Sequence, residues 1–304
     1  MRRQVILAMV VGVGVVFTVG VVVWANAQGL IGFGGRAGRL LTQAQRAIQQ
    51  DEWSIAQAKL EELVGVFPAS PWTDDGLLQL GGVYEHDQHL LEAHATYRLL
   101  VSQVPHSPLA AQAQERLGVV NVALLFSPAT AEGDLVYDVK SGDTLGKIAE
   151  RYHTTVELLK KANRLSSDVI RPGHALKIPT GRFGVVVDKS QNQLLLTQDG
   201  QFFKTYPVAT GTNGSTPVGS FKILNKIPRP VWYRQGAVVP PDSPENILGT
   251  RWLGLDKQGY GIHGSVDSGG IGKQVTAGCV RMHNEDVEEL YAIVPVGTPV
   301  TIVD

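Results

Sequence analysis

The residues of this chain best suited to covalent chemistry lie near its C-terminus. Cys279 is the only cysteine among the 304 residues, so it has no disulfide partner within the chain, and His263 lies sixteen positions before it. A thiolate beside an imidazole base is the Cys/His form of nucleophilic acyl transfer. On these two residues alone a buried structural cysteine is the alternative, because free cysteine is among the most buried residue types.

The start of the chain indicates where such chemistry would take place. Arg2 and Arg3 precede a run of twenty uncharged, valine-rich residues, 5–24. A helix of that length spans the ~30 Å hydrocarbon core of a bilayer, and the arginines favour a cytoplasmic N-terminus. We therefore predict that residues 1–27 are an anchor, held in the inner (cytoplasmic) membrane by residues 4–25. A cleaved signal peptide is the alternative, because Ala25-Asn26-Ala27 is an A-x-A site.

Both alternatives export the body of the protein to the cell envelope, either the periplasm or the outer face. A lone thiol in an oxidising compartment favours a chemical role for Cys279. The 27 basic and 28 acidic residues create no field that would attract nucleic acid. We also predict no metal and no cofactor, since the histidines of the first half have no metal-like grouping. These histidines are His86, His89, His94 and His106.

The first folded segment is predicted to be a helical repeat array. Residues 28–38 are glycine-rich and predict a flexible linker. Within residues 39–126, Phe67-Pro-Ala-Ser-Pro71 recurs as Val104-Pro-His-Ser-Pro108, an offset of 37 residues. A fixed period in the thirties predicts stacked helical hairpins, with the prolines between hairpins. The segment resembles a short tetratricopeptide-like array, which is either a plain spacer or a groove for a protein partner.

Residues 134–180 predict a small βααβ module. Residues 136–139 alternate like a strand, Asp143 or Thr144 can cap a first helix, and residues 170–179 form a turn and a returning strand. The opening Y-D-V-K-S-G-D-T-L and the closing P-G-H-A-L-K-I-P resemble the LysM family, which binds N-acetylglucosamine-containing glycans such as peptidoglycan. A βααβ domain without glycan affinity is the alternative. The resemblance implies a groove made by Gly142, Asp143, Thr144, Leu145, Ile170, Pro172 and Gly173.

Residues 183–304 predict a mainly antiparallel β domain with one short helix. Apolar or alternating runs separated by turn residues fill this segment, and only residues 284–293 have a helical pattern, with Asn284 as the expected N-cap. Four motifs follow in order and together resemble the YkuD-type L,D-transpeptidase catalytic domain. They are Thr216-Pro-Val-Gly-Ser-Phe221, Asn246-Ile-Leu-Gly249, Gly261-Ile-His-Gly264 and Thr276-Ala-Gly-Cys-Val-Arg-Met282.

This resemblance implies a role for each residue of the last two motifs. Cys279 would attack a stem-peptide carbonyl to form a thioester, with His263 as the base and a backbone carbonyl at or near Gly264 orienting the imidazole. The N–H groups around Gly278 and Cys279 are natural oxyanion donors. Arg281 either anchors a carboxylate or orders its loop. Thr276 keeps the hydroxyl of the family's usual serine, whereas Ala277 replaces its usual histidine.

The chain is therefore expected to be multidomain: a transmembrane or signal helix, all-α hairpin repeats, a βααβ module and a β catalytic domain. The expected function is a cysteine-dependent L,D-transpeptidase that forms or remodels peptidoglycan cross-links in cell-wall biogenesis and cell shape. The alternatives are an L,D-carboxypeptidase, a hydrolase that uses water as acceptor, or a non-catalytic wall-binding scaffold. The expected partners are peptidoglycan, the membrane and a protein at the repeats.

Overall fold

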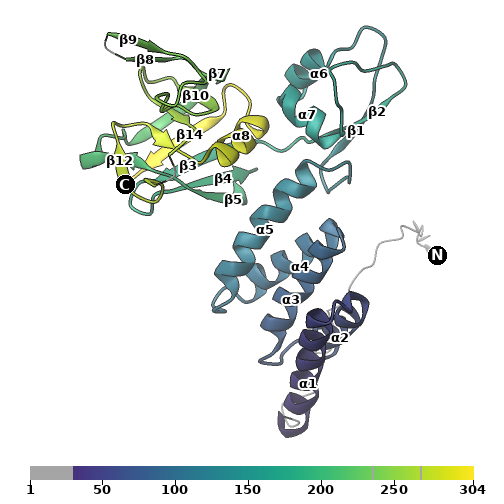
Figure 1. Cartoon of the computed structure of the whole chain (residues 1–304). Helices are drawn as coiled ribbons and strands as arrows, with labels where there is room; N and C mark the ends of the chain where they lie inside the picture. The colour runs from purple at the N-terminus through teal and green to yellow at the C-terminus, as the bar shows by residue number, and fades with distance from the viewer. Residues whose placement is uncertain (1–29, 235, 268) are drawn as a thin grey trace, which may run out of the picture.

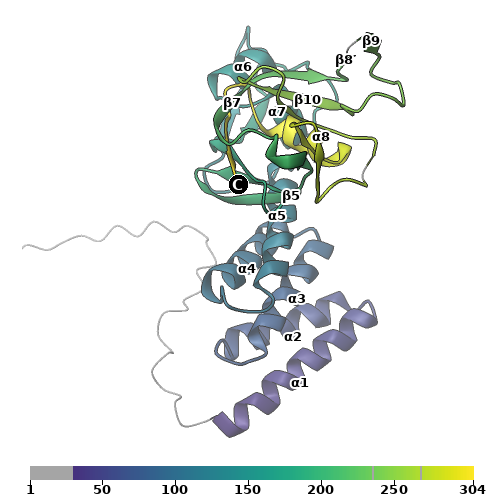
Figure 2. The ribbon, with the colours of Figure 1, turned by 90° about the vertical axis from the view of Figure 1, so that its left-hand side faces the viewer.

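The computed structural model describes residues 30–234, 236–267 and 269–304. The helical array forms a stack that starts with α1 at one end, and the β domain and the βααβ module lie together at the other end (Figures 1 and 2). Within the described ranges, no helix has both the length and the apolar character needed to cross a membrane. The predicted anchor or signal peptide, residues 1–27, lies outside these ranges.

Five helices build the array, and their order is compatible with the predicted hairpins. They are α1 (Leu30–Gln49), α2 (Trp53–Val66), α3 (Thr73–His86), α4 (Leu90–Gln103) and α5 (Ala110–Leu125). The two proline-containing segments fall between α2 and α3 and between α4 and α5, as expected. Positions 37 residues apart also have the same environment. Ala56, Leu60 and Leu63 of α2 are fully buried, and so are Ala93, Tyr97 and Leu100 of α4.

The prediction of a flexible linker at residues 28–38 is wrong for the part that the structure describes, because α1 begins at Leu30. A glycine inside a helix costs about 1 kcal/mol, but each fully buried leucine returns about 1.5–3 kcal/mol. Ala37, Leu40 and Leu41 are buried in the cluster that joins α1 to α2. Gly38 also has a packing role, since a Cβ there would lie 3.2 Å from Nε1 of Trp72.

The βααβ module has the predicted element order, β1 (Leu135–Asp138), α6 (Leu145–Arg151), α7 (Val156–Ala162) and β2 (Ala175–Ile178). The two strands pair antiparallel, with Leu135 opposite Ile178. Each helix starts at a threonine cap: Oγ1 of Thr144 accepts from the Lys147 N–H at 3.2 Å, and Oγ1 of Thr155 accepts from the Leu158 N–H at 2.8 Å. These caps satisfy N–H groups that the helix itself leaves unpaired.

The β domain is one eight-stranded sheet with α8 (Asn284–Ile293) packed against it. The strand order is β13-β11-β10-β7-β14-β3-β4-β5, and only the β11–β13 and β14–β3 pairs are parallel. This confirms the expected mainly antiparallel domain. The strands are β3 (Phe183–Asp188), β4 (Gln193–Gln198), β5 (Gln201–Pro207), β7 (Gly219–Pro228), β10 (Arg251–Leu255), β11 (Gly261–His263), β13 (Val280–Arg281) and β14 (Pro299–Val303).

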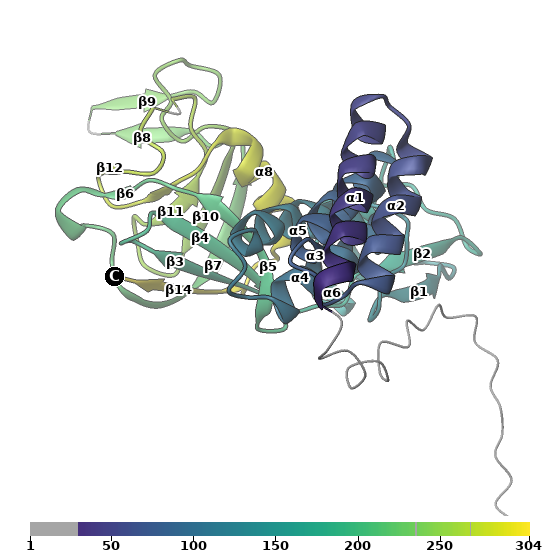
Figure 3. The same ribbon diagram turned by 90° about the horizontal axis from the view of Figure 1, so that it is seen from below.

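Two further strand pairs and one turn lie outside this sheet. β6 (Thr210–Gly211) pairs with β12 (Gln274–Thr276), next to the short 3₁₀ turn η1 (Thr212–Gly214). β8 (Trp232–Arg234) and β9 (Ala237–Val239) form a hairpin. The hairpin projects from the side of the β domain that is away from the helical array (Figure 3).

Buried polar contacts join the three folded parts, which the sequence did not predict. Lys177 of β2 is 5% exposed, and its Nζ donates to the carbonyl oxygens of Leu124, Ser127 and Ala129 at 2.9, 3.0 and 2.6 Å. Oγ1 of Thr155 donates to the Ala292 carbonyl of α8. At the sheet edge, Nδ2 of Asn121 in α5 donates to the Phe203 carbonyl at 2.8 Å. The βααβ module is therefore fixed to both α5 and α8.

Candidate active site

Cys279 and His263 lie on the same face of the sheet. β11 and β13 pair in parallel, with Ile262 beside Val280 and His263 beside Arg281. Ile262 and Val280 are 0% and 1% exposed and belong to the hydrophobic core. Because successive side chains of a strand point to opposite faces, His263, Arg281 and Cys279 all lie on the face away from the core.

The imidazole of His263 is buried and oriented. Its exposed fraction is 4%, and Nδ1 lies 2.6 Å from the Gly264 carbonyl oxygen. A carbonyl only accepts, so Nδ1 carries the proton and Nε2 keeps a free lone pair. The backbone of this residue is also held, because its carbonyl accepts from the Met282 N–H at 2.9 Å. The imidazole is therefore set up to accept a proton at Nε2.

The thiol of Cys279 is half-buried, and in this state it points to backbone. Its Sγ donates to the Gly259 carbonyl at 3.7 Å. Within the described ranges no hydrogen bond joins Sγ to the imidazole of His263. Hydrogen bonds of this kind are often long or absent in unliganded enzymes.

Both groups are neutral near pH 7, because burial disfavours their charged forms. Burial lowers the pKa of His263 to about 4; the hydrogen bond to Gly264 opposes this shift, and the nearby charge of Arg281 adds to it. Burial also raises the pKa of the Cys279 thiol, with a backbone hydrogen bond from Gly261 acting in the opposite direction. The resting site is therefore a thiol and a neutral imidazole rather than an ion pair.

The loop before Cys279 is held by Thr276. Oγ1 of Thr276 donates to the Cys279 carbonyl at 2.7 Å and accepts from the Gly278 N–H at 3.2 Å. Of the two expected oxyanion donors, the Gly278 N–H is thus already engaged, which leaves the Cys279 N–H. Gly278 has a φ of +138° and a Cβ there would lie 2.8 Å from Cε1 of Tyr260, so only glycine fits.

Arg281 packs under the loop that precedes β12. A Cβ on Gly270 would lie 2.0 Å from its Nη2, and its Nε is buried without a hydrogen-bond partner among the described residues. The backbone of Arg281 exchanges two hydrogen bonds with Ala209, at 2.9 and 2.7 Å. Between the two roles expected for Arg281, this geometry favours the ordering of its loop.

The other two motifs support the loops around the site. Oγ1 of Thr216 accepts from the Gly211 N–H at 2.7 Å, and a Cβ on Gly211 would lie 2.9 Å from Cα of Gly278, so this turn packs against the nucleophile loop. Nδ2 of Asn246 donates to the carbonyls of Pro230 and Pro240 at 2.9 and 3.0 Å. Asn246 therefore closes the base of the β8–β9 hairpin.

Asn284 has a different role from the helix cap expected for it. The N-cap of α8 is His283, which makes no side-chain capping bond. Oδ1 of Asn284 instead accepts from the Thr250 N–H at 3.0 Å. Cβ atoms on Gly249 and Gly264 would each lie 2.3 Å from this oxygen. Asn284 thus packs against the same Gly264 that orients the imidazole, a contact between distant segments that the chain order does not reveal.

The residues expected to bind glycan lie on two adjacent loops of the βααβ module. The Val139 N–H donates to the His174 carbonyl, and the Gly173 N–H donates to the Val139 carbonyl, both at 2.9 Å. Gly142 and Gly173 adopt φ of +85° and +87°, which suits tight turns. Exposure differs among the rest. Pro172 is exposed, Ile170 packs at the edge of the module's hydrophobic core, and Leu145 is buried in that core with 2% exposure. The other two have polar contacts: Asp143 accepts from the Tyr137 hydroxyl, and Thr144 caps α6.

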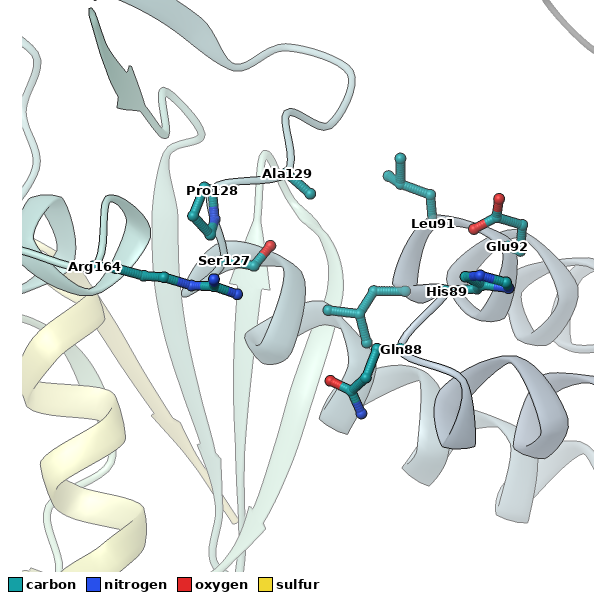
Figure 4. Close-up of a pocket in the computed structure, with 9 residues that line it drawn as sticks. Gln88, His89, Leu91, Glu92, Ser127, Pro128, Ala129 and Arg164 are labelled. Atoms are coloured by element: carbon teal, nitrogen blue, oxygen red, sulfur yellow. The ribbon is translucent and has the colours of Figure 1, made fainter. Parts of the chain in front are cut away.

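Two cavities lie outside this catalytic pair. One of about 390 Å³ separates the α3–α4 turn from the segment after α5, with His89 and Glu92 on one side and Arg164 on the other (Figure 4). A second of about 250 Å³ adjoins Asn284 and Thr250 at the foot of the β8–β9 hairpin. Among the described residues, no group of three or more His, Cys, Asp or Glu side chains could hold a metal ion.

Two family models match this chain, one over the β domain and one over the βααβ module. The model of the L,D-transpeptidase catalytic domain, YkuD, matches residues 182–302, and that of the LysM domain matches residues 137–179. The chain is 38% identical over 175 residues to the protein that bears the name L,D-transpeptidase YkuD in Bacillus subtilis (strain 168); the match covers 55% of this chain and 98% of that protein. The Bacillus licheniformis YkuD protein is 39% identical over 176 residues, with the same two coverages.

A solved structure with the same assignment also aligns with the chain. It is the catalytic domain of the Enterococcus faecium L,D-transpeptidase, acylated by ertapenem. The sequence identity is 21% and the TM-score is 0.34, and the alignment covers 41% of this chain and 100% of that domain.

Proposed function

This chain belongs to the YkuD-type L,D-transpeptidases, and we propose that Cys279 is its nucleophile and His263 its base. The observation that carries this proposal is the shared sheet face of the two side chains, with the imidazole fixed by the Gly264 carbonyl. With its LysM domain, the protein is a cell-wall enzyme that binds peptidoglycan. The test is intact-mass analysis of the full chain after incubation with ertapenem, in which a single adduct should map to Cys279.

The proposed reaction uses the neutral pair in two half-reactions. Nε2 of His263 takes the thiol proton as Sγ attacks an amide carbonyl of a stem peptide, and the Cys279 N–H stabilises the oxyanion that forms. Collapse breaks the C–N bond, and the imidazolium returns its proton to the leaving amine. The thioester then accepts an amine from a second stem, which forms the cross-link and regenerates the thiol.

The group that attacks the thioester, the acceptor, decides which reaction the enzyme completes. Water in place of the amine would hydrolyse the same thioester and make the protein an L,D-carboxypeptidase. We propose the amine as acceptor because the relatives are named as transpeptidases. Mass spectrometry of the products separates the two outcomes, since a cross-linked dimer forms only with an amine and a shortened stem accumulates with water.

The lowered pKa of His263 predicts the pH dependence of acylation. Because burial lowers the pKa of His263 to about 4, the imidazole remains an unprotonated base at all higher pH values. As pH falls through that value, the base is lost. We therefore expect the second-order rate constant for ertapenem acylation to be level between roughly pH 6 and pH 8 and to decline only below about pH 5.

Stopped-flow measurement of the acylation rate across this range checks the prediction. The Tyr260→Phe variant, which keeps the ring beside Gly278, should give the same profile and serves as a control. A decline centred near the ordinary histidine pKa would contradict the burial of the imidazole in the working enzyme.

We further propose that the loops at residues 142–145 and 170–173 form the glycan groove of the LysM domain. The full chain should co-sediment with peptidoglycan from which the stem peptides have been removed, and it should do so at high salt. Residues 134–180 carry eight basic and six acidic side chains, too small an excess to hold a wall by charge alone. Binding lost at moderate salt would indicate charge attraction and contradict the groove.

For the rest of the chain we propose that residues 1–27 are the membrane anchor and that α1–α5 form a tetratricopeptide-like array open to a protein partner. The matched burial of α2 and α4 at an offset of 37 residues supports the array. N-terminal sequencing of the mature protein decides between anchor and signal peptide. A chain that retains Arg2 and Arg3 supports the anchor, and a chain that begins at Gln28 contradicts it.

A further inference from the structure

Four strands bring one row of side chains across the face that carries the catalytic pair. The register places Ile227 of β7 beside Trp252 of β10, Trp252 beside His263 of β11, and His263 beside Arg281 of β13. All four side chains lie on the face away from the core, because the next residue of β10, Leu253, is 0% exposed in the core. Trp252 is therefore the nearest neighbour of the base on the side opposite Arg281.

The indole of Trp252 occupies space that two glycines leave free. Gly254 and Gly261 are register partners on β10 and β11. A Cβ on Gly254 would lie 2.8 Å from Nε1 of the indole, and a Cβ on Gly261 would lie 2.6 and 2.7 Å from Cζ2 and Cη2. The ring thus lies across both glycines, with its Cζ2–Cη2 edge over Gly261. Gly261 is beside Cys279, because Ile262 pairs with Val280 in the parallel β11–β13 pair. Any side chain at either glycine would displace it.

The indole in turn faces the imidazole. The ring centroids of Trp252 and His263 are 6.0 Å apart and the planes differ by 20°, an offset-stacked arrangement. Among the described residues, the imidazole makes one hydrogen bond, through Nδ1 to the Gly264 carbonyl. That bond fixes one ring atom, but a single hydrogen bond does not set the tilt of the ring about it. The stacked indole can supply a second constraint on the ring, which is itself only 4% exposed.

We propose that Trp252 is a positioning residue, whose indole, held on Gly254 and Gly261, fixes the plane of the His263 imidazole so that Nε2 faces the thiol of Cys279. This inference rests on the proposed roles of Cys279 and His263. It adds a residue of β10, which contains none of the four sequence motifs that resemble the L,D-transpeptidase catalytic domain. In this proposal Trp252 acts through the base.

The first test replaces the indole and measures ertapenem acylation. We expect Trp252→Ala to slow acylation by about 10–100-fold, since displacement of a catalytic group by about 1 Å costs up to about 100-fold. Its acidic decline should move from about pH 4 toward the ordinary histidine value, because the imidazole becomes hydrated. Trp252→Phe keeps an aromatic plane and should recover most of the rate and the wild-type profile.

A matched control is offered by Trp53 in the helical array, which stacks on His86 at a centroid distance of 3.7 Å. Trp53→Ala removes another tryptophan–histidine stack far from the thiol, and it should leave acylation unchanged. The ratio between Trp252→Ala and Trp53→Ala then reports the effect of the indole on the base rather than a general loss of stability.

A second variant disturbs the indole without removing it. Gly254→Ala places a methyl group against Nε1 of Trp252 and against Oδ1 of Asn225; Asn225 is exposed and free to move away, so the strain falls on the indole. We expect slower acylation and an acidic decline at higher pH, both smaller than in Trp252→Ala.

The outcomes separate this inference from the proposed function. Wild-type acylation rates and acidic declines in Trp252→Ala and Gly254→Ala, together with slow acylation in His263→Gln, would overturn the role of Trp252 and keep that of His263. Wild-type rates in His263→Gln as well would overturn the base assignment itself. A uniform loss of rate in Trp252→Ala and Trp252→Phe with an unmoved acidic decline would also overturn the positioning role.

Discussion

Replacing Cys279 by alanine is expected to abolish acyl-enzyme formation with ertapenem. The chain has no other cysteine, so no second thiol can form a thioester. The side chain is half-buried, and the removal of one sulfur atom leaves the backbone bonds of the loop from Thr276 intact. Intact-mass spectrometry should therefore show the wild-type chain shifted by one drug molecule and the alanine variant unshifted.

The control for this experiment is Thr276→Ser, which keeps the hydroxyl that holds the Cys279 and Gly278 backbone. It should acquire the adduct like the wild-type chain. Thermal unfolding of Cys279→Ala should match that of the wild-type chain, which shows that the loss of the adduct is chemical. An adduct of full occupancy on Cys279→Ala would contradict the assignment of the nucleophile.

Replacing His263 by glutamine is expected to slow acylation by about 10²–10⁴-fold, the usual contribution of a positioned base. Glutamine has an amide that can donate to the Gly264 carbonyl, as Nδ1 does now, but it cannot accept the thiol proton. Burial raises the pKa of Cys279, so the variant must rely on a thiolate that is scarce at neutral pH. Its acylation rate should therefore rise steadily with pH above 7, where the wild-type rate is level.

Single-turnover acylation followed by mass spectrometry gives both rate constants on one scale. His283→Gln is the matched control, because His283 lies closer to Cys279 in sequence but precedes α8 without a side-chain capping bond. It should acylate at the wild-type rate. An unchanged neutral rate in His263→Gln, or a large loss in His283→Gln, would transfer the role of the base.

The sequence predicted those parts of the protein whose determinants are local. A 37-residue repeat of proline-containing segments placed the hairpins, and threonines before apolar runs marked the starts of α6 and α7. Cys279 and His263 could be proposed from the sequence because each lies in a short motif that carries a reactive group, and the two motifs follow one another in the same domain. In each case the physical cause, whether a cap, a proline or a nucleophile, lies within a short stretch of the sequence.

The parts that the sequence did not predict depend on contacts between distant segments. Residues 30–38 form the start of α1 because Ala37 and Leu40 are buried against α2, which overrides the preference of glycine for flexible chain. Trp252 faces His263 only through the register of β10 and β11. Asparagine is a common N-cap residue, yet Oδ1 of Asn284 accepts from the N–H of Thr250, 34 residues earlier in the chain. None of these contacts follows from local composition.

The buried amine of Lys177 has a consequence for the choice of cross-link. Its three carbonyl partners lie at the end of α5 and in the segment after it, while Thr155 of the same module bonds to α8 beside the catalytic sheet. These bonds fix the βααβ module relative to the catalytic sheet. We therefore expect a constant distance between the loops at residues 142–145 and 170–173 and the thiol of Cys279. If those loops bind glycan as proposed, we expect a bound strand to present to Cys279 only the stems at one spacing and one rotation along the strand, so that the position of a stem on the glycan would decide whether it reacts.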